Sequence, residues 1–173
     1  MMSLCCKVLD ALSGKTLVSA ESLTGGGIGN ALTAVPGSSR VYKGGIISYT
    51  NAVKEKILNV SPEILNHCGA VSAPTAKAMA CGARELLCAD VAISVTGLAG
   101  PDGDEFGNPV GTVFIGYSSQ ARTVVKHCCF AGDREAVRVQ TIQAALSLVL
   151  EMEGIDEPRS KVRASDCQLG SET

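Results

Sequence analysis

The chain has 173 residues, of which 46% are hydrophobic and 18% are charged, values typical of one folded domain rather than a disordered chain. A net charge of −2, the absence of Trp and an aromatic content of 3% argue against binding to a nucleic-acid backbone or to stacked bases. No apolar run reaches the ~18 residues of a membrane helix, and the N-terminus lacks the pattern of a signal peptide. We therefore expect a cytoplasmic protein with reduced cysteines and with neither nucleic acid nor membrane as a partner.

Apolar periodicity in the first half of the chain predicts alternating helices and strands. The expected elements are a helix over 4–12, a strand over 16–20, a helix over 28–35, a strand over 42–49, a helix over 51–58 and a short helix after Ser61-Pro62. Glycines 25–27 form a turn between the first strand and the second helix.

The second half predicts a helix over 74–88 that is capped by Ser72, and a strand over 91–96 that is apolar enough to be buried on both faces. A glycine-rich loop, a hairpin of strands over 111–118 and 122–130, and a helix over 134–152 follow. This order predicts an α/β fold, a three-layer α/β/α sandwich with a mixed β-sheet. We expect a single domain over 1–152 and a mobile tail over 153–173.

The segment Thr24-Gly25-Gly26-Gly27 follows a predicted strand and opens a predicted helix. Free main-chain N–H groups at such a point can hold an anion, although a tight turn that needs small residues for packing explains the same pattern. The dinucleotide-binding fingerprint is incomplete, because Asn30 stands where its third glycine belongs.

The side chains available for catalysis leave few alternatives. No Gly-x-Ser-x-Gly elbow and no Ser-x-x-Lys pair occurs, and His67 and His127 are each followed by cysteine without a Cys-x-x-Cys motif, which disfavours a zinc site or a histidine triad. Lys54 is a candidate base if burial lowers its pKa, with Tyr49 as a proton relay and Ser38 or Ser39 as nucleophile. A solvated helix lysine is the competing interpretation.

Two later segments are candidates for further walls of a site. Small residues from Thr96 to Gly103 follow a buried strand, where a ligand can approach the backbone closely, although an ordinary loop has the same composition. Arg134 and Arg138 are four residues apart on one helix and suit a phosphate or a carboxylate, unless they form only a surface ion pair with Glu135.

Taken together, these segments resemble the CinA-type amidase family, the nicotinamide-nucleotide amidase domain, over about residues 4–152. The matching segments are Ala20-Glu21-Ser22-Leu23-Thr24-Gly25-Gly26, Pro36-Gly37-Ser38-Ser39, Ser48-Tyr49-Thr50-Asn51, Thr96-Gly97-Leu98-Ala99-Gly100-Pro101, Pro109-Val110-Gly111-Thr112-Val113 and Gly132-Asp133-Arg134. The resemblance implies a three-layer α/β/α domain that hydrolyses the carboxamide of nicotinamide mononucleotide. The products are nicotinic acid mononucleotide and ammonia, in pyridine-nucleotide recycling, with no metal or organic cofactor.

The resemblance also implies roles for individual residues. Ser39 corresponds to the nucleophile, Lys54 to its base and Tyr49 to a residue that assists proton transfer. The substrate-binding residues are Ser22, Thr24, Gly25, Gly26, Thr96, Gly97, Ala99, Gly100, and Arg134 or Arg138. We expect a small-molecule nucleotide as substrate, a homo-oligomer, and the stand-alone form that lacks the family's additional N-terminal domain.

One position departs from the family pattern, because Leu23 stands where the family usually has cysteine. This change either strengthens the serine route or marks an altered substrate range. The alternative function is a catalytically inactive nucleotide-binding or regulatory domain. A role in DNA uptake or damage response, which the family's naming suggests, finds no basic patch in the sequence.

Overall fold

The computed structural model describes residues 1–155, which form a single α/β domain around one five-stranded mixed sheet. The strands are β1 (Leu17–Glu21), β2 (Tyr42–Ile47), β3 (Val91–Gly97), β4 (Thr112–Ser119) and β5 (Thr123–Cys129). They are arranged in the order β2-β1-β3-β4-β5. Strand β1 pairs in parallel with β2 and β3, whereas β4 runs antiparallel to both β3 and β5.

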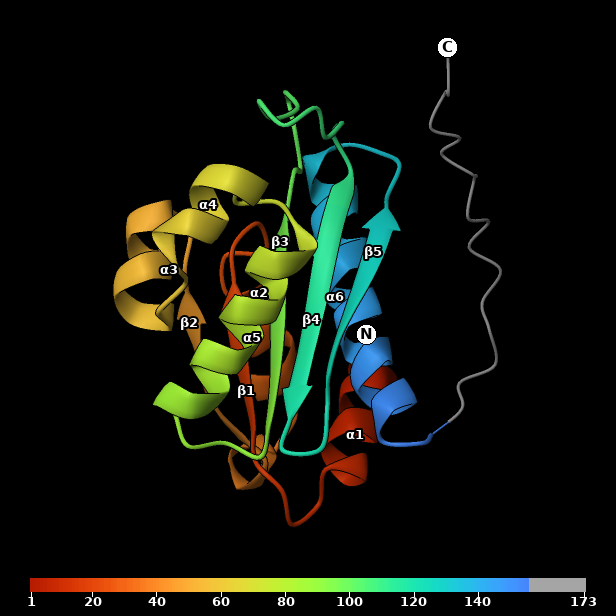
Figure 1. Ribbon diagram of the computed structural model, residues 1–173. Helices are drawn as coiled ribbons and strands as arrows, with labels where there is room; N and C mark the ends of the chain where they lie inside the picture. Colours follow the sequence, from red (N-terminus) through yellow and green to blue (C-terminus); the bar gives the residue numbers. More distant parts are fainter. Residues whose placement is uncertain (156–173) are drawn as a thin grey trace.

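Helices cover both faces of this sheet (Figure 1). One layer holds α3 (Asn51–Leu58), α4 (Pro62–Cys68) and α5 (Ala73–Leu86), with α5 lying directly on the strands. The other holds α1 (Met2–Ala11), α2 (Gly27–Thr33) and α6 (Arg134–Met152), and a 3₁₀ turn, η1 (Ser38–Arg40), precedes β2. The predicted α/β fold with a helix-flanked mixed sheet is therefore confirmed.

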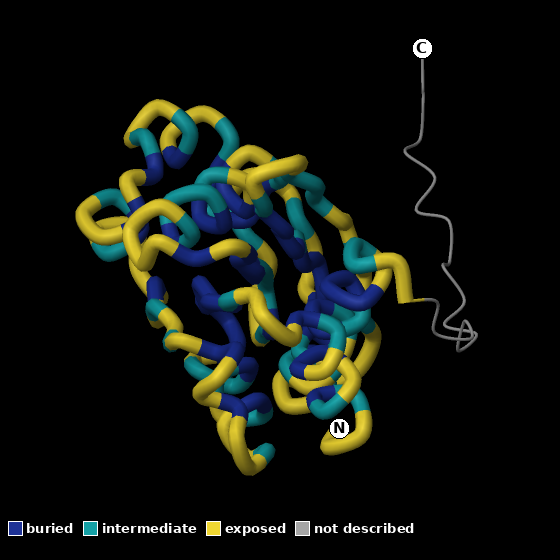
Figure 2. Tube along the Cα trace, turned by 90° about the horizontal axis from the view of Figure 1, so that it is seen from below, coloured by how far each residue is buried: buried dark blue, intermediate teal, exposed yellow. Residues whose placement is uncertain are grey.

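The central strands are buried on both faces, and successive residues of β1 enter different cores. Leu17 packs into the core beneath α1, α2 and α6, whereas Val18 and Ala20 pack against α3 and α5. This alternation follows from the two-residue period of a strand. Figure 2 shows the buried residues concentrated inside the domain and the exposed residues along its outer surface.

Side-chain caps begin several helices at the expected residues. Ser61 accepts a hydrogen bond from the N–H of Glu63, and Ser72 accepts one from the N–H of Thr75. Helices 51–58 and 134–152 have the predicted bounds, whereas the strand expected to reach Tyr49 ends at Ile47. The tail predicted over 153–173 lies outside the described residues from 156 onward.

Helices α3 and α5 approach each other closely at Gly82. A Cβ atom at this position would overlap the carbonyl oxygen of Leu58, at the end of α3. Glycine at 82 therefore sets how closely α5 can lie to the end of the helix that carries Lys54.

Within residues 1–155, no helix is long and apolar enough to cross a membrane. The cysteines of that part of the chain form no disulfide with one another. Its His, Cys, Asp and Glu side chains also form no group of three that could hold a metal ion.

Candidate active site

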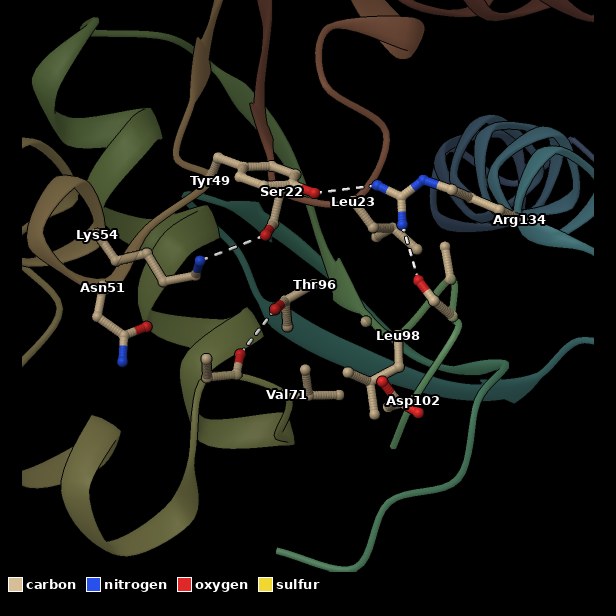
Figure 3. Close-up of a pocket in the computed structure, with 14 residues that line it drawn as sticks. Ser22, Leu23, Tyr49, Asn51, Lys54, Val71, Thr96, Leu98, Asp102 and Arg134 are labelled. Carbon is tan, nitrogen blue, oxygen red and sulfur yellow. Dashed lines mark hydrogen bonds between the residues drawn. The ribbon is translucent and has the colours of Figure 1, made fainter. Parts of the chain in front are cut away.

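A cavity of about 250 Å³ lies at the carboxyl ends of the parallel strands β1, β2 and β3 (Figure 3). Chain connections leave these strand ends in different directions, because β1 leads to α2 on one face and β2 leads to α3 on the other. Such a switch point is the usual place for a ligand in an open α/β sheet. The lining residues are Ser22, Leu23, Tyr49, Asn51, Lys54, Ala70, Val71, Thr96, Gly97, Leu98, Ala99, Gly100, Asp102 and Arg134.

Lys54 and Ser22 meet at the wall of this cavity. The Nζ of Lys54 lies 3.3 Å from the Oγ of Ser22 and donates a hydrogen bond to the carbonyl of Ser48 at 2.8 Å. The Lys54 side chain is only 1% exposed, and burial lowers its pKa to about 8. Burial disfavours the charged ammonium, so a much larger fraction of this lysine is neutral near physiological pH than for a solvated lysine. The interpretation of Lys54 as a solvated helix residue is wrong.

Ser22 owes its position to the end of β1. Its main-chain N–H donates to the carbonyl of Val95 on β3 at 3.0 Å, which continues the pairing of β1 and β3 by one residue. The chain then turns into α2 through Gly25 and Gly26, both of which have positive φ angles that favour glycine.

The main-chain N–H groups of the glycine turn bind the side chain of Glu21. The Glu21 carboxylate accepts hydrogen bonds at 3.0 Å from the main-chain N–H groups of Gly26, Ile28 and Gly29. The hydroxyl of Thr24 donates to the same carboxylate at 2.7 Å. The expectation that this turn binds a substrate anion is therefore wrong, because Glu21 already occupies it.

The two arginines of α6 have different partners although they are one turn apart. Arg134 lines the cavity, where it donates to the carbonyl of Gly100 at 2.9 Å and to the Tyr49 hydroxyl at 3.0 Å. Arg138 donates to the carbonyls of Leu23 and Thr24 at 3.0 and 2.9 Å. Arg134 therefore faces the cavity, whereas Arg138 holds the turn after Ser22.

The structure separates Ser39 from Lys54. Ser39 lies on η1, which precedes β2, whereas the cavity lies beyond the other end of that strand. At about 3.3 Å per residue, β2 alone spans roughly 17 Å. Ser39 is exposed, and its carbonyl accepts a hydrogen bond from Lys43. The expectation that Ser38 or Ser39 lies beside Lys54 is wrong, since the loop that carries them enters the strand from the far end.

Most of the other expected substrate-binding residues meet at the cavity. Ser22, Thr96, Gly97, Ala99, Gly100 and Arg134 line it, together with Tyr49. Thr24, Gly25, Gly26 and Arg138 are not among the lining residues, because they build the turn behind Ser22. The Thr96 hydroxyl donates to the carbonyl of Ala70 at 2.7 Å, which ties β3 to the segment before α5.

Sequence reasoning missed Asn51 and Val71, which add a polar group and apolar surface to the cavity. Leu98 and Asp102 also line it and belong to the segment 96–103 that was expected to form a wall. Asn51 could have been found from the sequence, because it lies three residues before Lys54 in a predicted helix and residues at this spacing share one helix face. Nothing in the local sequence marks Val71, whose place depends on how α4 and α5 pack.

A model of the CinA C-terminal domain matches residues 3–152. The chain belongs to this family. It is 48% identical over 134 residues to a CinA-like protein of Solibacter usitatus and 44% identical over 153 residues to a putative competence-damage inducible protein of Geobacillus kaustophilus. These matches cover 78% and 87% of this chain but only 32% and 37% of the relatives, so the chain spans about a third of their length.

Solved structures of the CinA family share the fold. Competence damage-inducible protein A from Klebsiella pneumoniae is 37% identical, with a TM-score of 0.85, over 87% of this chain and 94% of that one. The competence/damage inducible protein CihA from Agrobacterium tumefaciens is 34% identical, with a TM-score of 0.84, over 87% and 94% of the two chains.

Proposed function

We propose that this CinA domain is an amidase that hydrolyses the carboxamide of nicotinamide mononucleotide, with Ser22 as nucleophile and Lys54 as its general base. The observation that carries this proposal is the contact between the buried Lys54 amine and the Ser22 hydroxyl at the wall of a cavity. A serine becomes a nucleophile when an adjacent base can take its proton, and a desolvated lysine is such a base. The substrate itself comes from the resemblance to the nicotinamide-nucleotide amidases.

In the first half of the reaction, neutral Lys54 takes the proton of Ser22 as Oγ attacks the carboxamide carbon. The Lys54 ammonium then gives this proton to the leaving nitrogen, and ammonia departs from an acyl-serine. The carbonyl of Ser48, 2.8 Å from Nζ, keeps the amine oriented in both protonation states.

In the second half, water attacks the acyl-serine while Lys54 accepts its proton, which releases nicotinic acid mononucleotide and restores Ser22. The negative charge on the tetrahedral oxygen needs donors that are not already occupied. The glycine-turn amides of Gly26, Ile28 and Gly29 are bound to Glu21. The main-chain N–H groups of the lining residues Leu23 and Ala99 are therefore the candidates, and one such donor is typically worth about 3 kcal/mol.

Arg134 supplies the positive charge for the substrate phosphate. Its guanidinium borders the cavity and bridges Tyr49 and Gly100, so it is already oriented before a ligand binds. Charge-assisted hydrogen bonds from arginine suit a phosphate. Tyr49 thus orients Arg134, a role that the hydrogen bond supports better than proton transfer to the serine.

The test is ammonia release from nicotinamide mononucleotide by the wild type and by three variants. We expect Ser22→Ala and Lys54→Met to lose nearly all activity while remaining folded, and Ser39→Ala to retain it. Mass spectrometry of a quenched reaction should locate the acyl group on Ser22. Tight nucleotide binding without ammonia release would instead identify a non-catalytic binding domain.

If Ser39→Ala lost activity and Ser22→Ala remained active, Ser39 would be the nucleophile and the role of Ser22 would be contradicted. Both serine variants keep the overall charge of the chain, so neither changes long-range attraction of an anionic substrate.

A further inference from the structure

Glu21 is a charged side chain that is only 1% exposed and is not among the residues that line the cavity. Its Oε2 accepts hydrogen bonds from the Thr24 hydroxyl and from the N–H groups of Gly26 and Ile28, at 2.7, 3.0 and 3.0 Å. Its Oε1 accepts from the N–H of Gly29 and the hydroxyl of Ser19, at 3.0 and 3.1 Å. All five bonds are accepted, as the carboxylate form allows.

These bonds join elements on both sides of Ser22. Ser19 belongs to β1, before the turn, whereas Gly26, Ile28 and Gly29 belong to the beginning of α2, after it. The Tyr42 hydroxyl, 2.7 Å from the Oγ of Ser19, extends the network to β2. The Glu21 carboxylate therefore closes the loop that presents Ser22.

The main-chain carbonyls of the same turn are bound by an arginine of α6. Arg138 donates to the carbonyls of Leu23 and Thr24, so the residues that follow Ser22 are fixed by a second, separate group. The Ser22 main chain is meanwhile paired with Val95. With three anchors around it, Ser22 has little freedom to move away from Lys54.

We propose that Glu21 is the positioning residue of the nucleophile, whose carboxylate closes the turn that holds the Ser22 hydroxyl against Lys54. This inference rests on the proposed role of Ser22. Glu21 acts through geometry, since its hydrogen bonds go to Ser19, Thr24 and the beginning of α2, whereas Lys54 bonds to Ser22 and Ser48.

Glu21→Gln tests this inference with almost no change in volume. In either orientation, the amide of glutamine places an NH₂ group against at least one main-chain N–H of α2, because both carboxylate oxygens accept from such groups. A displacement of about 1 Å at a reacting atom can reduce the rate about 100-fold. We expect kcat to fall about 100-fold with KM nearly unchanged, because no group that touches the substrate is removed.

The matched control is Asp90→Asn. The Asp90 carboxylate accepts from the N–H and hydroxyl of Thr16, before β1, at the end of the sheet opposite the cavity. This variant removes the same charge and should leave kcat and KM unchanged. Thr24→Val, which removes one hydroxyl donor to Glu21, should lower kcat about 10-fold and provides a test if Glu21→Gln does not fold.

A second readout is independent of the substrate. A fluorophosphonate reagent should label Ser22 of the wild type and should label the Glu21→Gln and Thr24→Val variants more slowly, in parallel with kcat. Amide hydrogen exchange over residues 22–29 should become faster in Glu21→Gln but not in Asp90→Asn.

The outcomes separate the two proposals. Labelling of wild-type Ser22 without hydrolysis of nicotinamide mononucleotide would reject the proposed substrate while slower labelling of Glu21→Gln still supported the positioning role. Wild-type labelling rates and an unchanged kcat in Glu21→Gln, or a change in KM alone, would overturn the positioning role. An unreactive wild-type Ser22 with no ammonia release would overturn both.

Discussion

The Nζ of Lys54 lies between two oxygen atoms, the Oγ of Ser22 at 3.3 Å and the carbonyl of Ser48 at 2.8 Å. A proton can move between Lys54 and the Ser22 hydroxyl, whereas the carbonyl of Ser48 has no proton to exchange and only orients the amine. Lys54 comes from α3 and Ser22 from the end of β1, so their contact depends on the packing of a helix against a strand rather than on a local motif.

The rate should depend on the protonation of Lys54. Burial lowers its pKa to about 8, and only the neutral amine can accept the Ser22 proton. We expect kcat/KM to rise with pH, to reach half its maximum near pH 8, and to level off above that value. Initial rates from pH 6 to 10 measure this profile. The Asp90→Asn variant should have the same midpoint, and a rate that falls between pH 7 and 9 would contradict the role of Lys54 as base.

Stability should depend on the same group in a defined direction. The pKa of Lys54 is lowered in the folded protein from an ordinary 10.5, so between pH 8 and 10.5 the unfolded chain binds more protons than the folded one. The free energy of unfolding due to Lys54 must therefore increase with pH in this window. A shift of this size corresponds to about 3 kcal/mol, since each pKa unit is worth about 1.4 kcal/mol.

The Lys54→Met variant isolates this contribution to stability. We expect this variant to be more stable than the wild type at pH 7, and its advantage to shrink by about 3 kcal/mol by pH 10.5. Urea unfolding of both proteins at several pH values measures the difference, in which the titration of other groups cancels. A difference that does not change with pH would mean that Lys54 is not desolvated in solution.

Arg134→Met should weaken binding of the phosphate-bearing substrate. Loss of a charge-assisted contact typically costs about 1.5–3 kcal/mol, so KM for nicotinamide mononucleotide should rise about 10- to 150-fold. The corresponding riboside, which has no phosphate, should be affected much less. Steady-state kinetics with both compounds measure the split.

The control for Arg134 is Arg40→Met. Arg40 is an exposed residue of η1, at the end of β2 away from the cavity. This variant removes the same charge, so equal effects of the two variants would show that overall charge, and not a contact with Arg134, attracts the substrate.

Gly82→Ala should destabilise the fold by about 1–3 kcal/mol, the usual cost of inserting a methyl group into a packed interface. The new Cβ would overlap the carbonyl of Leu58, so α5 and the end of α3 must separate. Urea unfolding measures the loss. Lys77→Ala, an exposed change on the same helix, should stay within about 0.5 kcal/mol of the wild type. Equal stability of the two variants would contradict the close packing.

The sequence predicted the elements well where patterns are local. Residues that become buried recur every four positions in helix 134–152, as Val137, Thr141, Ala145 and Val149, and Ser72 and Pro74 mark the beginning of α5. The unbroken apolar run from Val91 correctly predicted a central strand covered on both faces, which determined the layer architecture.

The candidate site was predictable only in part, because its geometry depends on which strand ends meet. Lys54 and Thr96 were found from residue type and position, and both line the cavity. Ser38 and Ser39 were expected beside Lys54 because they precede β2, whereas the contact is made by Ser22, which lies 32 residues before Lys54. Likewise, the sequence of a glycine turn does not reveal whether its N–H groups bind a ligand or, as here, the side chain of Glu21.

The anchors from α6 have a consequence for how the protein is made. Arg138 binds the carbonyl of Thr24 across 114 residues of chain, and Arg134 completes the cavity from α6, the last helix within residues 1–155. A nascent chain that has emerged only as far as β5 contains Ser22 and Lys54 but lacks the clamp on the serine turn. Activity should therefore arise as a late event of biosynthesis, when α6 docks, and should be absent from shorter translation products.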